Sequence, residues 1–250
     1  MSGIRPDRPA TIRAMFERLA PDYDRLNTVL TFGLDRSWRR AMVRAADVRR
    51  GDRVLDVCAG TGRSLEAVRR AIGPEGIAVG LDFTEAMLRR AGGPRVLGDA
   101  LRLPFPDRCF DASVSAFAVR DVADQRGLFD EMARVTRPGG GVGILEVGGP
   151  RNRAAGVGFD LWFRGAVPRV AAAFGQGEAH RFLVRSVEYL PDPARLLRMM
   201  VAAGLEDPEA RDLSLGAARV FRGRKPREGA PREGRPREDV PPGPPPAGYG

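Results

Sequence analysis

The sequence is poor in histidine, lysine and cysteine: its 250 residues include only His180, Lys225, Cys58 and Cys109 of these types. One histidine excludes a histidine-rich metal centre or a Ser/His/Asp triad, so we expect no metal site. Two cysteines exclude a disulfide-stapled fold and suit a reducing compartment. Because both cysteines fall in or beside expected core strands, we expect them to be small buried apolar residues rather than nucleophiles.

Long apolar stretches are also lacking. No run approaches the ~18 residues that a spanning helix needs, and the charged N-terminal segment has no apolar core like that of a signal peptide. We therefore expect a cytoplasmic protein.

The charge is basic, with 41 Lys and Arg against 32 Asp and Glu and a formal net charge of +9. Such a surplus favours phosphate-rich partners in general. However, residues 222–250 carry +3 and the preceding 221 residues only +6, without a concentrated basic stripe. We expect no specific nucleic-acid partner; a steeply salt-dependent affinity for RNA would support the alternative, an RNA-binding or RNA-modifying protein.

The C-terminal segment differs in composition from the rest. Residues 226–250 contain PREGA, PREGR and PREDV followed by PPGPPPAGYG, and hold eight of the 21 prolines. This segment has few apolar residues to bury. We predict one folded domain at 1–225 and a disordered Pro/Arg/Gly-rich tail at 226–250, either a solubilising tail or one that binds a partner.

From Asp52 onward, short β-rich runs alternate with helical patterns. This alternation predicts an α/β fold with a mostly parallel sheet between helices. We expect seven strands, at 53–58, 77–81, 96–98, 110–117, 142–147, about 211–215 and 218–221. The run 138–141, Pro-Gly-Gly-Gly, is expected to stop the preceding helix, and Asp192 with Pro193 to begin a late one.

Two segments stand outside this alternation: residues 10–46, which look helical, and residues 151–190. Ligands of open α/β sheets bind at the carboxyl ends of the strands, so we expect both segments to form a lid there. The second segment interleaves aromatic residues with arginines, namely Phe159, Trp162, Phe163 and Phe174 with Arg153, Arg164, Arg169 and Arg181. Those aromatics either pack the roof of the pocket or lie at a lipid interface; His180 is expected to be structural.

The strongest local motif is Asp56-Val-Cys-Ala-Gly60-Thr61-Gly62 between the first strand and its helix. Its glycines allow the backbone to approach a ligand and expose amides at the helix start. A dinucleotide-binding G-x-G-x-x-G would need a third glycine where this chain has Leu65, which disfavours a nicotinamide-dependent oxidoreductase. An acidic residue ahead of the turn suits a cationic ligand better than a pyrophosphate.

Two more aspartates end the next strands. Asp82 can accept hydrogen bonds from both hydroxyls of a ribose, and Asp99 can face an adenine amino group. Aspartate is common in turns, but three of them on successive strand ends beside a glycine turn indicate a nucleoside that carries positive charge. S-adenosylmethionine is therefore the expected cofactor.

The chain resembles the ubiquinone/menaquinone biosynthesis C-methyltransferases over about residues 12–225. The resemblance is carried by Tyr23-Asp24-Arg25-Leu26-Asn27 with Trp38, Asp56 to Gly62, Gly80-Leu81-Asp82-Phe83, Leu103-Pro104-Phe105-Pro106, Phe110-Asp111, Phe117 to Val122, and Arg134 to Gly140 reaching Glu146. It implies a Rossmann-like class I methyltransferase that transfers methyl from S-adenosylmethionine to a ring carbon of a prenylated quinol, either demethylmenaquinol or a related benzoquinol. A same-fold enzyme for another small molecule is the alternative. A homodimer and a peripheral contact with the inner face of the membrane stay open.

The resemblance also implies cofactor contacts. Thr61 and Asp82 would contact the cofactor, and Asp99 with Ala100 would hold its adenine. Asp56, Gly60, Gly62 and Phe83 complete the expected set, together with Ala116, which stands where some members carry a cofactor-binding serine.

On the substrate side, the family's Arg-Asn pair appears as Arg120-Asp121, and a histidine usual before the tryptophan is Asp35. We expect Arg120 to stabilise a developing phenolate or orient a water, Asp121 to accept or relay a proton, and Tyr23 to close the site. The alternative is a structural ion pair between Arg120 and Asp121, with Asp121 capping a helix.

Overall fold

The structure is a computed structural model that describes residues 9–19, 23–149, 165 and 189–228. The expectations for the aromatic residues, arginines and His180 of the 151–190 segment lie outside the described residues. So does most of the expected tail, beyond Glu228.

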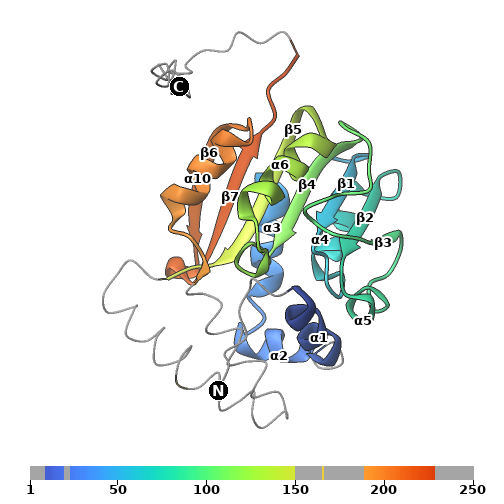
Figure 1. Cartoon of the computed structure of the whole chain (residues 1–250), viewed down its shortest axis with the longest axis vertical. Helices are drawn as coiled ribbons and strands as arrows, with labels where there is room; N and C mark the ends of the chain where they lie inside the picture. Colours follow the sequence, from blue (N-terminus) through green and yellow to red (C-terminus); the bar gives the residue numbers. More distant parts are fainter. Residues whose placement is uncertain (1–8, 20–22, 150–164, 166–188, 229–250) are drawn as a thin grey trace, which may run out of the picture.

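A seven-stranded sheet forms the centre of the molecule. Its strands are β1 (Arg53–Val57), β2 (Ile77–Asp82), β3 (Arg95–Leu97), β4 (Phe110–Ala116), β5 (Thr136–Val147), β6 (Glu206–Leu213) and β7 (Ala218–Arg224). They lie in the order β3-β2-β1-β4-β5-β7-β6, with β7 antiparallel to both of its neighbours (Figure 1). The predicted mostly parallel sheet is confirmed.

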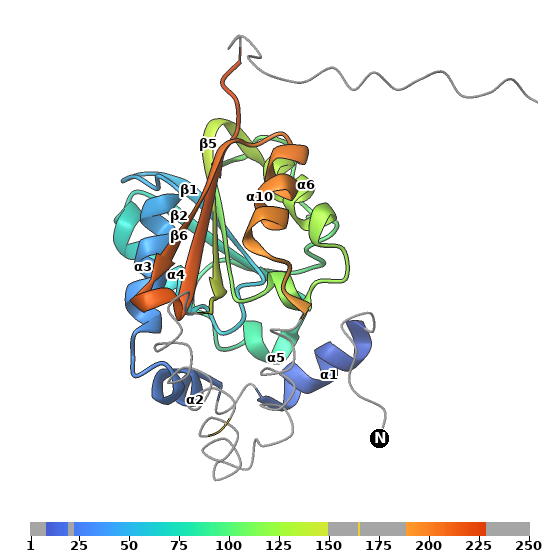
Figure 2. The same cartoon turned by 90° about the vertical axis from the view of Figure 1, so that its left-hand side faces the viewer.

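Helices cover both faces of this sheet. They are α1 (Pro9–Leu19), α2 (Tyr23–Leu30), α3 (Asp35–Ala45), α4 (Arg63–Ile72), α5 (Glu85–Leu88), α6 (Gln125–Val135) and α10 (Pro193–Ala202), with 3-10 turns η1 (Val119–Asp121) and η4 (Ser214–Gly216). Figure 2 shows α3 and α4 on one face and α6 and α10 on the other. Helices α1, α2 and α5 lie beyond the carboxyl ends of the strands, where the expected N-terminal lid should be.

Each face of the sheet has its own apolar core. Under α6 and α10, Phe129, Met132 and Met200 pack with Leu55 and Phe221. The opposite core, under α3 and α4, is built from Trp38, Met42, Val54, Leu65, Val68, Ile72 and Val114. Burying both faces explains why the central strands read as nearly continuous apolar runs.

Close packing between α4 and the sheet uses a glycine on the strand side. A Cβ on Gly80 of β2 would lie 2.8 Å from Cδ1 of Leu65. In dinucleotide-binding folds the third glycine of the turn provides this close approach from the helix. Here Leu65 fills that position and Gly80 makes room for it, so the missing third glycine does not disturb the fold.

Two strands, β5 and β6, begin at least five residues before the expected positions, and β7 ends at Arg224 rather than at residue 221. β5 begins at Thr136 and includes the Pro-Gly-Gly-Gly run that was expected to lie outside it; the register with β4 shifts there, and a Cβ on Gly141 would collide with the carbonyl of Ala46. β6 begins at Glu206 rather than near residue 211. It is one of the two edge strands, with exposed acidic residues and Pro208 at a register shift, so it lacks the alternating pattern that reveals a strand.

The N-terminal helices are attached to the sheet domain by specific contacts. Ile12 and Met15 of α1 are buried against Met87 of α5, and Trp38 Nε1 of α3 donates a 2.8 Å hydrogen bond to Ser214 Oγ. Within the residues that the structure describes, none of the helices combines the length and hydropathy of a transmembrane span.

Candidate active site

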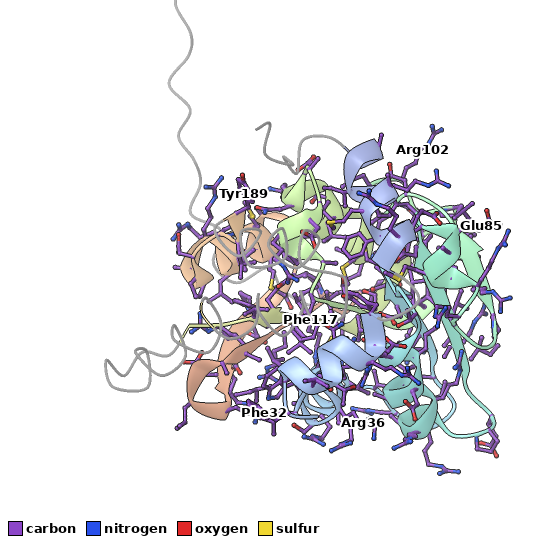
Figure 3. The ribbon with its side chains drawn as sticks, turned by 90° about the horizontal axis from the view of Figure 1, so that it is seen from below. Phe32, Arg36, Glu85, Arg102, Phe117 and Tyr189 are labelled. Carbon is purple, nitrogen blue, oxygen red and sulfur yellow. The ribbon has the colours of Figure 1, made fainter. Side chains whose placement is uncertain are left out.

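A cavity of about 70 Å³ opens at the carboxyl ends of β1, β2 and β4. Its lining residues are Phe16, Tyr23, Cys58, Gly60, Asp82, Phe83, Thr84, Met87, Ala116, Phe117, Ala118, Asp121 and Val122. Figure 3 views the molecule from this end: Phe117 lies near the middle of the face, and Phe32, Glu85, Arg102 and Tyr189 lie toward its edge. Five predicted site residues outside the glycine turn therefore meet in one pocket: Tyr23, Asp82, Phe83, Ala116 and Asp121.

The glycine turn connects β1 to α4 beside this pocket. Gly60 has φ +56° and its backbone N–H donates a 2.8 Å hydrogen bond to Asp82 Oδ2. Apart from Gly60 and its chain neighbours, no atom of the described residues lies within 4 Å of where a Cβ on Gly60 would stand, whereas a Cβ on Gly62 would meet Ala91 at 2.9 Å. Gly60 thus leaves space on the ligand side, and Gly62 allows the start of α4 to pack closely against Ala91.

Asp56 is buried at the end of β1, and neither carboxylate oxygen has a hydrogen-bond partner among the described residues. Burial raises the pKa of Asp56 to about 7; the charge of Arg39 lowers it and that of Asp82 raises it further. An ionised carboxylate without a partner is costly in a protein interior. A positively charged group beside Asp56 would therefore stabilise its ionised form.

Asp82 is also buried, but it is well bonded. Besides the Gly60 amide, the Thr84 backbone N–H donates to it at 2.8 Å, and its pKa is raised because burial outweighs these bonds. A carboxylate has about four acceptor sites, so two remain for ribose hydroxyls. Burial together with the charges of Asp82 and Asp56 raises the pKa of the Cys58 thiol well above its ordinary value, which keeps it neutral as expected.

These residues fit S-adenosylmethionine on three counts. The unbonded Asp56 carboxylate suits the cationic methionine end, the spare acceptor sites of Asp82 suit a ribose, and the open side of Gly60 allows a close approach to the backbone. Phe16, Phe83, Met87 and Phe117 make much of the remaining wall apolar and aromatic, and Tyr23, Thr84 and Asp121 add polar groups to it.

Arg120 forms a buried ion pair with a partner that the sequence prediction did not include. Its Nη1 donates a 2.6 Å hydrogen bond to Glu146 Oε2 at the end of β5, and the Val119 amide donates to Oε1 of the same carboxylate at 2.8 Å. Asp121 lies farther away, with Oδ2 4.0 Å from Arg120 Nε. Glu146 thereby fixes η1, so that Asp121 lines the pocket and Arg120 lies behind it.

Tyr23 faces this pair from α2. Its ring packs edge to face on Phe16 with centroids 6.1 Å apart. Burial raises the pKa of the Tyr23 phenol, while Asn27 and the charge of Arg120 oppose that shift. The phenol therefore stays protonated and can donate a hydrogen bond into the pocket.

Arg39 is a buried residue of the site that sequence reasoning missed. Its guanidinium lies 5.3 Å from the centre of the Phe117 ring and donates to Ser64 Oγ, and burial lowers its pKa. The only local signal is its i, i+4 spacing from Asp35, with an Nε to Oδ2 distance of 3.7 Å. Nothing else in the sequence separates it from its exposed arginine neighbours.

The remaining predicted residues lie around the pocket rather than in its lining. Asp99 is exposed after β3 and accepts a 2.9 Å hydrogen bond from the Leu101 amide. Ala100 is buried in the core under α6, and Thr61 donates its hydroxyl to Asp24. Among the described residues, no three His, Cys, Asp or Glu side chains form a group that could hold a metal ion.

The sheet order and the acidic glycine turn give the chain the Rossmann-like fold of class I S-adenosylmethionine-dependent methyltransferases. A methyltransferase of this class from Thermotoga maritima has a TM-score of 0.62 and 21% identity, covering 85% of this chain and 98% of its own. A phosphoethanolamine N-methyltransferase 2 from Haemonchus contortus, solved with S-adenosyl-L-methionine, has a TM-score of 0.52 and 16% identity over 74% of this chain and 51% of its own.

The model of the ubiE/COQ5 methyltransferase family matches residues 5–225, and the chain belongs to that family. A demethylmenaquinone methyltransferase of Roseiflexus sp. (strain RS-1) is 42% identical over 88% of this chain and 96% of its own length. The ubiquinone/menaquinone biosynthesis C-methyltransferase UbiE of Geobacter sulfurreducens is 36% identical over 86% and 88%. The family resemblance stated from the sequence is confirmed, and the chain is a methyltransferase.

Proposed function

We propose that the protein methylates a ring carbon of a prenylated quinol, of the demethylmenaquinol or related benzoquinol type, with S-adenosylmethionine as the methyl donor. The observation that carries this proposal is the pocket itself. Asp82 lines this pocket together with aromatic residues, Tyr23 and Asp121, and the buried Asp56 lies on the neighbouring strand without a hydrogen-bond partner among the described residues. The names of the relatives support the quinol as substrate.

Asp56 and Asp82 would hold the cofactor, with the Gly60 turn against it. Bound there, the cofactor supplies an electrophilic methyl group on a sulfonium. Asp56 contributes a fixed negative charge for a cation, which a buried site makes stronger than the same contact in water. Phe83 and Met87 line the pocket beside Asp82 and would pack against the bound cofactor.

A quinol ring carbon becomes a good nucleophile when a ring hydroxyl gives up its proton. We assign Asp121 as the acceptor because it is a carboxylate that lines the same pocket as Asp82. The neutral Tyr23 phenol would hydrogen-bond the resulting oxyanion. Arg120, bonded to Glu146, acts as a positioning residue for η1 and adds positive charge near that oxygen.

Incubation with methyl-labelled S-adenosylmethionine and reduced demethylated quinones tests this assignment. We expect label on a ring carbon, located by mass spectrometry, with naphthoquinols and benzoquinols offered in parallel to define the head group. Label on small soluble phenols but on neither quinol would favour the alternative methyltransferase. Label only on RNA, or none with any acceptor, would refute the proposal.

We also propose peripheral contact with an anionic membrane, because a prenylated substrate resides in lipid. Flotation with vesicles that contain 30% anionic lipid at low salt should carry the protein upward. Flotation that disappears at high salt would support electrostatic contact, and no co-flotation at low salt would refute it. Light scattering in the same buffer decides between monomer and homodimer.

A further inference from the structure

Helix α2 is tied directly to the glycine turn. Thr61 Oγ1 donates a 2.7 Å hydrogen bond to Asp24 Oδ1. Arg63 Nη1 donates to the main-chain oxygen of Asp24 at 2.7 Å and to Thr28 Oγ1 at 2.9 Å. These bonds connect residues 35 to 39 positions apart in the chain. They join the helix that carries Tyr23 to the turn that would hold the cofactor.

Arg63 occupies an unfavourable position for a cation. It is the first residue of α4, where the helix dipole is positive. Its Nη2 lies 3.0 Å from Oδ2 of Asp35, whose side chain is 1% exposed. Desolvating a cation at the positive end of a helix costs stability. The bonds of Arg63 to α2 and α3 offset this cost, so we interpret Arg63 as a residue that fastens both helices to the start of α4.

The cavity behind these bonds is too small for a nucleoside cofactor. Its free volume is about 70 Å³, whereas pockets for ligands of this size measure roughly 300–1,000 Å³. Tyr23, next in sequence to Asp24, forms part of the wall together with Phe16. Binding a cofactor of this size therefore requires the wall to move, and Tyr23 is the part of that wall that α2 contributes.

We propose that Asp24 is a positioning residue that couples closure of α2 to occupancy of the cofactor site through the Thr61 hydroxyl. A hydroxyl has one proton and two lone pairs. The bond to Asp24 uses the proton and leaves the lone pairs for an N–H donor, such as the ammonium group of S-adenosylmethionine. This inference rests on the proposed function because it concerns the same cofactor.

Hydrogen–deuterium exchange on the ligand-free protein tests the bond between α2 and the turn. Asp24→Ala and Thr61→Val should each speed exchange of the amides of residues 24–31 about tenfold, as expected for losing a hydrogen bond to a charged group. The double variant should exchange no faster than either single variant, because both remove the same bond. Thr61→Ser, which keeps the hydroxyl, and Asp130→Asn, an exposed charge on α6, should match the wild type.

Calorimetric titration with S-adenosylhomocysteine tests the coupling. Since linkage is reciprocal, the variants that loosen α2 should raise Kd by up to the same factor, again without additivity. Additive effects on Kd, or a raised Kd with unchanged exchange, would overturn the proposal. If the wild type binds neither this ligand nor S-adenosylmethionine, the proposed function fails, and the exchange data still decide whether Asp24 fastens α2.

Discussion

Replacing Asp56 with Asn should make the protein more stable while weakening cofactor binding. The pKa of Asp56 rises from 3.8 to about 7 because the carboxyl is buried without a hydrogen-bond partner among the described residues. Three pKa units correspond to about 4 kcal/mol. The pKa of Asp56 is higher in the folded than in the unfolded chain. The protonated carboxyl therefore contributes about 4 kcal/mol to the free energy of unfolding below about pH 4, and this contribution is lost as pH rises through about 7.

The amide introduced by Asp56→Asn cannot ionise, so the free energy of unfolding of the variant should lack this pH dependence. At pH 4 and below the free energies of unfolding of the wild type and the variant should be similar, and at pH 5 the variant should already be more stable by about 1.6 kcal/mol, because Asp56 is then ionised in the unfolded wild type but not in the folded one. At pH 8 the variant should be more stable by up to about 4 kcal/mol, or roughly 10 °C in Tm for a chain of this size. Urea denaturation across pH 4–8 measures the difference.

The same variant should bind S-adenosylmethionine at least tenfold more weakly at pH 8. In the wild type at pH 7, binding a cation beside the partly protonated Asp56 should release its proton to the buffer. The measured enthalpy of binding should therefore depend on the ionisation enthalpy of the buffer. That dependence should vanish in Asp56→Asn and persist in Asp130→Asn. A stability difference that stays constant from pH 5 to 8 would refute the reasoning.

Three further predictions concern the substrate side and the domain boundary. Asp121→Asn, which restores the family's usual residue, should cut kcat at least tenfold with Kd for the cofactor unchanged; full activity would show that the carboxylate is not the proton acceptor. Glu146→Ala should lower the free energy of unfolding by about 3 kcal/mol, because it leaves the Arg120 charge buried without its 2.6 Å partner; a loss below 1 kcal/mol in urea would contradict the structural role. Truncation after residue 228 should leave Tm unchanged. Truncation after residue 224 removes Lys225, whose Nζ donates to the carbonyls of Ala133 and Thr136 near the end of α6, and should lower the free energy of unfolding by about 1–3 kcal/mol. Equal Tm values for the two truncations would contradict a boundary of the folded domain near residue 225.

The cofactor side of the site was predictable because its signals are local. Asp56 and Gly60 belong to one turn, and Asp82 ends the next strand, so the rule that parallel strands share a carboxyl edge brings them together. The capping of α10 by Asp192 was equally local, and its side chain accepts from the Arg195 amide at 2.9 Å. Each of these inferences needed only a short stretch of sequence.

The substrate side was less predictable because its bonds connect distant residues. Arg120 was paired with its neighbour Asp121 in the sequence alternative, but the strong partner is Glu146, which is 26 residues away. Asp24 and Thr61 are 37 residues apart, and no periodicity records such a bond. The predicted range of β6 was too short for a different reason. An exposed edge strand that contains Pro208 has no alternating pattern of apolar and polar residues to mark its beginning.

The net charge of +9 conceals the electrostatics of the site. Two arginines around the site are matched by buried carboxylates: Arg63 lies 3.0 Å from Asp35, and Arg120 lies 2.6 Å from Glu146. Asp56 has no such partner within 4 Å among the described residues, although it shares the same interior. Because a buried charge without a hydrogen-bonded partner is costly, and the charge of Arg39 acts on Asp56 without such a bond, we propose that Asp56 receives a cation that arrives with the ligand. This argument predicts that a neutral cofactor analogue without the methionine amino group would gain nothing from Asp56 and would bind the wild type and Asp56→Asn equally well.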